Sequence, residues 1–123
     1  MVARSVRAAI DHWEAVEMPV EQKRNKDTAK TRLATMNYFA AYVGETRIIS
    51  ELRTADVAAW GLYRISSRKN QHSTVKNRSG HIKALFDSAK RAGSYPREWE
   101  NPALDPVKFT KVDQEARAKA VLL

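Results

Sequence analysis

Apolar residues recur at helical spacing in four stretches of the chain, and these stretches predict four helices. The first covers residues 5–18, and Pro19 marks its end. Its apolar stripe consists of Val6, Ala9, Ile10, Trp13 and Val16. The second covers residues 26–43 and is followed by Gly44, a residue suited to ending a helix. Its stripe consists of Ala29, Leu33, Met36, Phe39, Ala40 and Val43.

The third helix is expected to begin at Thr54, whose hydroxyl can accept a hydrogen bond from an amide of the first turn. Asp56 then lies at the positive end of the helix dipole. This helix should end near residues 66–67. The fourth begins at residue 73 or 74 and closes at Gly93. One of its faces consists of Val75, Ile82, Leu85, Phe86 and Ala89.

The pattern changes after Gly93, where three X-Pro steps favour extended or turn conformations. They are Tyr95-Pro96, Asn101-Pro102 and Asp105-Pro106. Residues 1–94 are therefore predicted to form one helical domain and residues 95–123 a linker. A short helix over 113–123 would end in three apolar residues with no following partner, as in a chain cut before its next domain. The sequence predicts an all-α fold, a four-helix bundle with an irregular C-terminal linker.

The aromatic residues divide into core candidates and unassigned ones. Those on apolar stripes, expected to pack inside, are Trp13, Phe39, Trp60 and Phe86. The stripes leave Tyr38, Tyr42 and Tyr63 unassigned. Tyr95 and Trp99 fall in the linker and should either cover the bundle or meet a following domain.

The composition allows one domain with a modest core, since 43% of the 123 residues are hydrophobic. No cysteine is present, which excludes disulfides and thiolate metal sites. The sequence contains neither a membrane-spanning apolar run nor a secretory signal, so we expect a cytoplasmic location and no membrane partner.

Basic residues exceed acidic ones by 22 to 14, which gives a net charge of +8 and a pI near 10.0. Such a positive field favours a polyanionic partner, because contacts to a phosphate backbone release counterions. The same balance occurs in ribosomal, membrane-surface and merely soluble basic domains.

Two groups of basic residues lie beside predicted helices, and we expect them to form one continuous surface once the apolar stripes are packed. Around the start of the second helix stand Lys23, Arg24, Lys26, Lys30 and Arg32. On the fourth helix Lys76, Lys83 and Lys90 repeat every seven residues, flanked by Asn77, Arg78 and His81. Cations can contact phosphates, and side chains with forked hydrogen-bond donors can contact base edges. The Thr74 hydroxyl can contact a phosphate at the start of the helix. The alternative is a solvated helix face, and dipole complementarity alone explains Lys90.

The sequence contains no pattern of catalytic, metal-binding or phosphate-binding residues. The three histidines form no metal-binding pattern, Glu14 and Glu17 have no catalytic partner, and the four glycines are scattered. We therefore expect no enzyme activity, no cofactor and no metal site in this chain.

The order of features resembles the core-binding domain of phage-integrase-type tyrosine recombinases over roughly residues 5 to 110. A Trp-bearing first helix and a basic second helix ending at Val43-Gly44 come first. They are followed by LRTADV at residues 52–57 and TVKN at 74–77. The fourth helix then continues through Leu85-Phe86, Ala89 and Gly93 to Asn101-Pro102 and Val107.

This resemblance implies a SAM-like orthogonal four-helix bundle that binds the core site of a recombination reaction as duplex DNA. It implies a bacterial or phage-encoded protein acting in DNA integration and recombination, with a separate catalytic domain in the full-length parent and a monomeric isolated domain. The family's DNA-facing helices map onto Lys26, Lys30, Arg32, Thr74, Lys76, Asn77, Arg78 and His81. Lys83 joins these candidates from the lysine row.

The chain departs from the family's catalytic pattern. No H-x-x-R follows His12, His72 or His81, no tyrosine has a C-terminal nucleophile context, and an arm-type domain is missing. Binding, not strand exchange, is therefore the expected activity. Two alternatives stay open: a helical protein-interaction module that uses Trp99 and the apolar residues 121–123, and an RNA-binding helical domain.

Overall fold

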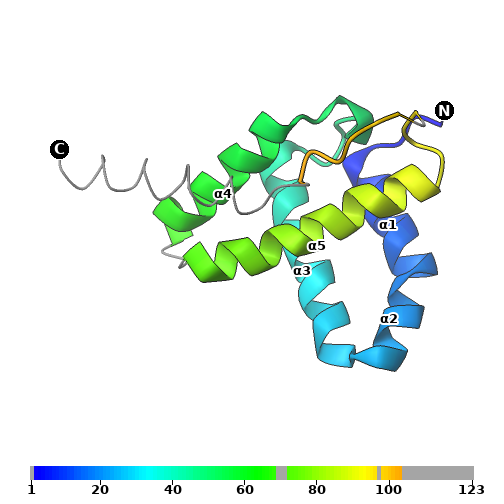
Figure 1. Ribbon diagram of the computed structural model, residues 1–123, viewed down its shortest axis with the longest axis horizontal. Coiled ribbons are helices and arrows are strands. Elements are labelled where there is room, and N and C mark those ends of the chain that lie inside the picture. Colours follow the sequence, from blue (N-terminus) through cyan, green and yellow to red (C-terminus); the bar gives the residue numbers. More distant parts are fainter. Residues whose placement is uncertain (1, 69–71, 97, 104–123) are drawn as a thin grey trace.

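The computed structural model describes residues 2–68, 72–96 and 98–103, with side chains apart from those of 65–68 and 72–77. Within these residues the chain forms five α-helices, one short 3-10 helix and no β-strand (Figure 1). The predicted all-α fold is confirmed. The described helices number five where the sequence indicated four.

The additional helix arises because the first predicted stretch is divided in two. Helix α1 (Val6–Val16) begins at Ser5, whose Oγ accepts a 3.0 Å hydrogen bond from the Ala8 amide. Helix α2 (Met18–Arg24) follows at once and contains Pro19 in its first turn. The first helix therefore ends at Val16, before the predicted end at residue 18, and Pro19 does not mark a helix end but lies in the first turn of α2. A proline is tolerated there because it lacks only an amide that has no intrahelical partner.

Helix α3 (Lys26–Val43) has the predicted bounds. The side chain of Asn25 fixes its start, since Oδ1 accepts a 3.0 Å hydrogen bond from the Thr28 amide. Gly44 ends it with a φ of 106°, in the region that favours glycine. The sequence therefore carries both end signals of this helix.

Helix α4 (Thr54–Arg68) follows the 3-10 helix η1 (Ile49–Glu51), and helix α5 spans His72–Arg91. At the start of α4, the Asp56 carboxylate accepts a 2.7 Å hydrogen bond from the Arg53 amide. Asp56 thus stabilises the positive end of the helix, as its sequence position predicts.

The core is built around Phe39 of α3. The Phe39 ring lies edge-on to Trp60 of α4, with centroids 5.7 Å apart, and edge-on to Phe86 of α5, at 6.1 Å. Trp13 of α1 is also fully buried. The prediction that these four aromatic residues pack inside is confirmed.

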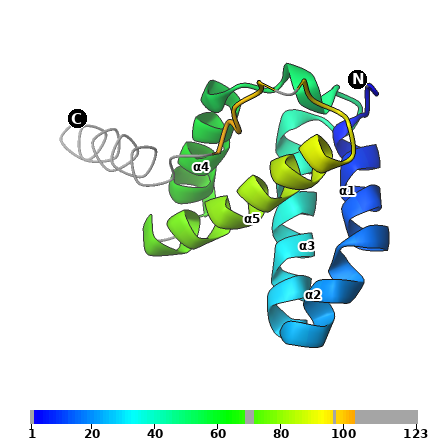
Figure 2. The same cartoon turned by 45° about the vertical axis from the view of Figure 1, so that its right-hand side comes forward.

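The five helices form two groups that meet at α3. Helices α1 and α2 lie along one side of α3, and α5 runs beside α4 before it crosses α3 (Figures 1 and 2). The N-terminal end of α5 projects beyond α3 next to the C-terminal end of α4. The N-terminal halves of α3 and α5 therefore diverge from their crossing point.

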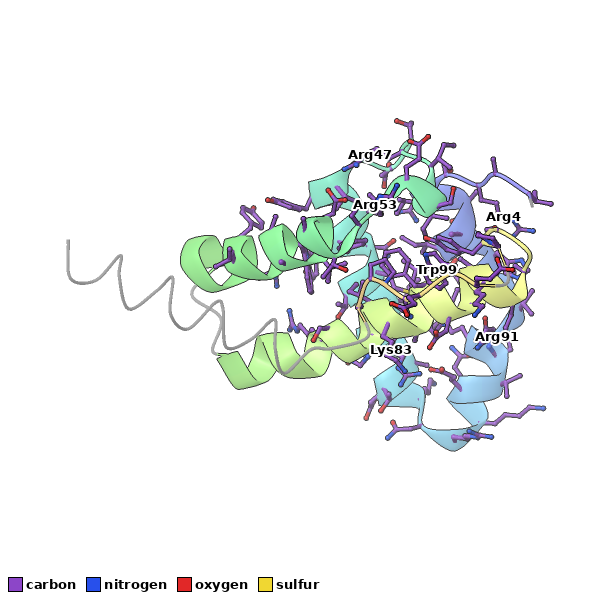
Figure 3. All side chains as sticks on the ribbon, turned by 45° about the horizontal axis from the view of Figure 1, so that its top comes forward. Arg4, Arg47, Arg53, Lys83, Arg91 and Trp99 are labelled. Atoms are coloured by element: carbon purple, nitrogen blue, oxygen red, sulfur yellow. The ribbon has the colours of Figure 1, made fainter. Side chains whose placement is uncertain are left out.

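Residues 98–103, here called the strap, pack against α5 together with Tyr95. The Tyr95 and Trp99 rings are stacked with centroids 3.7 Å apart, and Trp99 also lies 6.1 Å from Phe86 (Figure 3). Burial raises the pKa of the Tyr95 hydroxyl, which donates a hydrogen bond to the Ile49 carbonyl. Of the two roles left open for Tyr95 and Trp99, the described contacts are those of a cover on the bundle. The predicted helix over 113–123 lies outside the described residues.

The strap should contribute to stability through Asn101. Its Nδ2 donates to the Lys83 carbonyl (3.0 Å) and to Asp87 Oδ1 (2.9 Å), while its Oδ1 accepts from the Ala103 amide (2.8 Å). We expect Asn101→Ala to lower the free energy of unfolding by about 1–3 kcal/mol in urea titrations. The exposed neighbour Glu100, changed to Ala, should shift it by no more than about 0.5 kcal/mol. Equal stability of the two variants would show that the strap adds nothing to the fold.

Candidate nucleic-acid interface

Arg32 of α3 and His81 of α5 join the two helices where they cross. Arg32 Nε donates a 3.2 Å hydrogen bond to His81 Nδ1. The same guanidinium forms an ion pair with Glu21 of α2. Arg32 is therefore held between two neighbours, and its direction is fixed before any ligand arrives.

His81 is neutral at pH 7. Burial, the Arg32 guanidinium and the Arg78 guanidinium, in that order, lower its pKa from 6.5 to about 4. Because Nδ1 accepts a hydrogen bond from Arg32, the ring proton stands on Nε2. His81 thus supplies a donor in a positive field; it adds no charge and is not the solvated histidine that its polar surroundings in the sequence suggest.

Arg78 completes this arrangement from one turn before His81 on α5. It is partly exposed, and none of the carboxylates that the structure describes forms an ion pair with it. We call Arg32, Arg78 and His81 the crossing cluster. Three of the nine predicted site residues are therefore brought together.

Lys26 and Lys30 do not join the crossing cluster. Each residue of an α-helix is rotated by about 100° from the last, so Lys30 lies about 160° around α3 from Arg32 and Lys26 about 120°. Both lysines are exposed, near the turn between α2 and α3. They lie on a different side of α3 from the residues that contact α5.

Lys83 lies on the other side of α5 from His81, again about 160° away. Its ammonium forms a 3.6 Å ion pair with Asp87, and its carbonyl accepts from Asn101 of the strap. Lys90 Nζ donates to the Trp99 carbonyl at 3.4 Å. Figure 3 shows Lys83 projecting from α5 and Trp99 in the segment beside that helix. These two lysines therefore face the strap and not the α3 side.

The predicted single surface of both basic groups is consequently not formed by the described side chains. The seven-residue spacing of the lysine row indicates a common line, but it gives no information on what packs beside that line. The strap, classed as a linker from its prolines, lies along it. Lys83 and Lys90 are therefore separated from the crossing cluster by α5.

Three further candidates, Thr74, Lys76 and Asn77, lie in α5, but their side chains are outside the described ones. Positions 74 and 77 precede Arg78 and His81 by four residues each, so they share a helix face with them. The first turn of α5 contains no acidic residue. The positive end of this helix dipole is thus not neutralised from within its own first turn.

Sequence reasoning did not single out a second group of arginines, which consists of Arg4, Arg47 and Arg53. Figure 3 shows these residues at the end of the molecule away from the turn between α2 and α3. Arg47 forms a 3.5 Å ion pair with Asp56. They are far apart in sequence, so only the fold reveals that they belong to one region.

Other kinds of site have less support in the described part of the chain. No group of three or more His, Asp or Glu side chains there could hold a metal ion, and no helix there has the length and hydropathy to cross a bilayer. A hollow of about 590 Å³ lies between α1, α2 and α5. Two polar atoms at its border, Glu21 Oε2 and Ser88 Oγ, lack a partner, but both are buried below its surface.

Comparison of the chain with protein-family models, curated proteins and solved structures finds no match. The resemblance to recombinase core-binding domains therefore stays a prediction from sequence motifs.

The lowered pKa of His81 predicts a pH dependence of stability. The unfolded chain binds a proton to this residue near pH 6.5, whereas the folded chain does so only near pH 4. The free energy of unfolding should therefore fall as pH drops from 6.5 towards 4. His81→Gln should lack this part of the decrease in urea titrations across that range. The same pH dependence in both proteins would contradict a neutral, buried His81.

Proposed function

We propose that this domain binds duplex DNA through the face shared by the N-terminal halves of α3 and α5, with the crossing cluster at its centre. The observation that carries the proposal is the contact of Arg32 with His81 beside Arg78. Burial, and after it these two cations from two helices, lower the pKa of the histidine between them. A phosphate group would pair with Arg78, whose charge is balanced by none of the carboxylates that the structure describes, and so would be bound at this point.

The three residues of the crossing cluster have different parts in the proposed contact. Arg78, which has no carboxylate partner among the described residues, would contact a phosphate or a base edge with its forked donors. Arg32 is partly neutralised by Glu21 and would mainly orient His81 and maintain the field. His81 would donate from Nε2 while remaining uncharged.

The arrangement of the helices supports insertion of α5 into the major groove. Its N-terminal half projects beyond α3 (Figures 1 and 2), and the major groove admits one α-helix. The N-terminal residues of a recognition helix are those that usually reach base edges. Thr74, Lys76 and Asn77 would stand at this end of α5.

The remaining candidates take a lesser role in the proposal. Lys26 and Lys30 would add to the long-range field that attracts DNA and would touch only flanking phosphates. Lys83 would not contact the same duplex, because it faces the strap. From the motif resemblance we further propose that the duplex is a recombination core site, that the parent protein is cytoplasmic, and that its chemistry belongs to a separate catalytic domain.

Arg78→Ala tests this proposal in fluorescence anisotropy titrations with a labelled duplex. We expect a dissociation constant of about 10⁻⁴ to 10⁻⁶ M for the unchanged domain near physiological salt. The variant should bind several-fold more weakly, and its plot of log affinity against log salt should be less steep by about 1, because one phosphate contact is lost.

Arg53→Ala is the matched control, since it removes the same charge directly before α4, outside the crossing cluster. It should change the affinity and the salt slope much less. A flat salt response, or equal losses in both variants, would overturn the proposal. Tighter binding of duplex RNA than of duplex DNA would favour the RNA alternative.

A further inference from the structure

Two tyrosines of α3 are exposed although their rings are held in place from beneath. Tyr38 is 52% exposed and Tyr42 is 42% exposed. The two residues are four apart on α3, so they stand one helical turn from each other. Large exposed aromatic side chains at adjacent positions are a feature of binding surfaces.

The covered side of each ring is occupied by a residue of α4. The Arg64 guanidinium lies 4.7 Å from the centroid of the Tyr38 ring. The Tyr63 ring stacks on Tyr42 with centroids 4.9 Å apart and an angle of 25° between the planes. Arg64 itself is only 7% exposed. Both tyrosines are thus pre-organised, and little rotamer entropy would be lost when a ligand contacts them.

These residues, with Ala41, line a hollow of about 230 Å³ between α3 and α4. A guanidinium beneath Tyr38 draws electron density from the ring, which disfavours a second cation above it. A flat, electron-rich ring suits this position better, and the net charge of +8 favours a ligand that carries phosphate. An unpaired nucleobase within a nucleic-acid strand combines both properties.

We propose that the hollow at Tyr38 and Tyr42 binds an unpaired base of a nucleic-acid strand by stacking. This rests on the nucleic-acid function proposed above and extends it from duplex DNA to strands with exposed bases. The base would enter the hollow and stack against the exposed parts of the tyrosine rings that border it, while the positively charged domain attracts the adjoining phosphates.

The test compares three labelled probes of equal length at one salt concentration: a single strand, an abasic strand with the same phosphates, and a duplex. The unchanged domain should bind the base-bearing strand more tightly than the abasic one. The double variant Tyr38→Ser/Tyr42→Ser should weaken binding of the base-bearing strand about 10-fold, the effect of one lost stacking contact. Its binding of the abasic strand should not change.

Two control proteins separate stacking from other effects. Tyr38→Phe/Tyr42→Phe keeps the rings and loses the hydroxyl groups, so it should retain the preference for bases. Val16→Ser/Val20→Ser changes two side chains that are 54% and 57% exposed outside α3, and it should also retain the preference. Circular dichroism of each variant verifies that the helices are intact.

Equal binding of the base-bearing and abasic strands would overturn the stacking site, as would an unchanged preference in the Ser variant. A change in the sedimentation mass of the Ser variant without a change in preference would assign the tyrosines to chain-chain contact instead. Duplex binding that depends on Arg78 without any base preference would overturn only this inference. A base preference without duplex binding would overturn only the duplex function.

Discussion

Phe39 packs edge-on against Trp60 and Phe86, and this three-ring contact decides how α3, α4 and α5 cross. Arg32 stands two turns before Phe39 on α3, and His81 stands five residues before Phe86 on α5. Since both helices are rigid, the aromatic core also decides that Arg32 and His81 meet. The polar cluster on which the proposed function rests is therefore a consequence of apolar packing a few residues away.

The crossing cluster presents one unbalanced cation, Arg78, without leaving a buried charge unpaired. Arg32 is balanced by Glu21, and His81 avoids the cost of charge burial by remaining neutral, with its pKa near 4. Arg78 remains as a partly exposed cation beside them. In the proposed complex a phosphate would meet Arg78 beside the fixed pair of Arg32 and His81, while Lys26 and Lys30 would act through the field and at flanking phosphates.

Much of the fold could be predicted because its signals are local. The bounds of α3 follow from its apolar spacing and Gly44, and the burial of Trp13 or Phe39 follows from their place on apolar stripes. Helix α2 was missed because Pro19 is compatible with both the end of one helix and the first turn of another. Its position alone does not distinguish these cases.

The candidate site was predicted less completely, since its geometry depends on contacts between distant residues. The sequence places Arg32 and His81 on helices, but not their mutual hydrogen bond or the Glu21 ion pair. It also gives no sign that Asn101 and Trp99 bring the strap to the side of α5 that carries Lys83 and Lys90. A charge pattern on one helix indicates a face, and the partner of that face is set by the tertiary fold.

Amide chemical-shift mapping of the ¹⁵N-labelled domain during titration with duplex DNA tests the central claim most directly. We expect the largest shifts on Arg32, Arg78, His81 and their neighbours in the N-terminal halves of α3 and α5. Largest shifts at Arg4, Arg47 and Arg53, or along the strap, would contradict it.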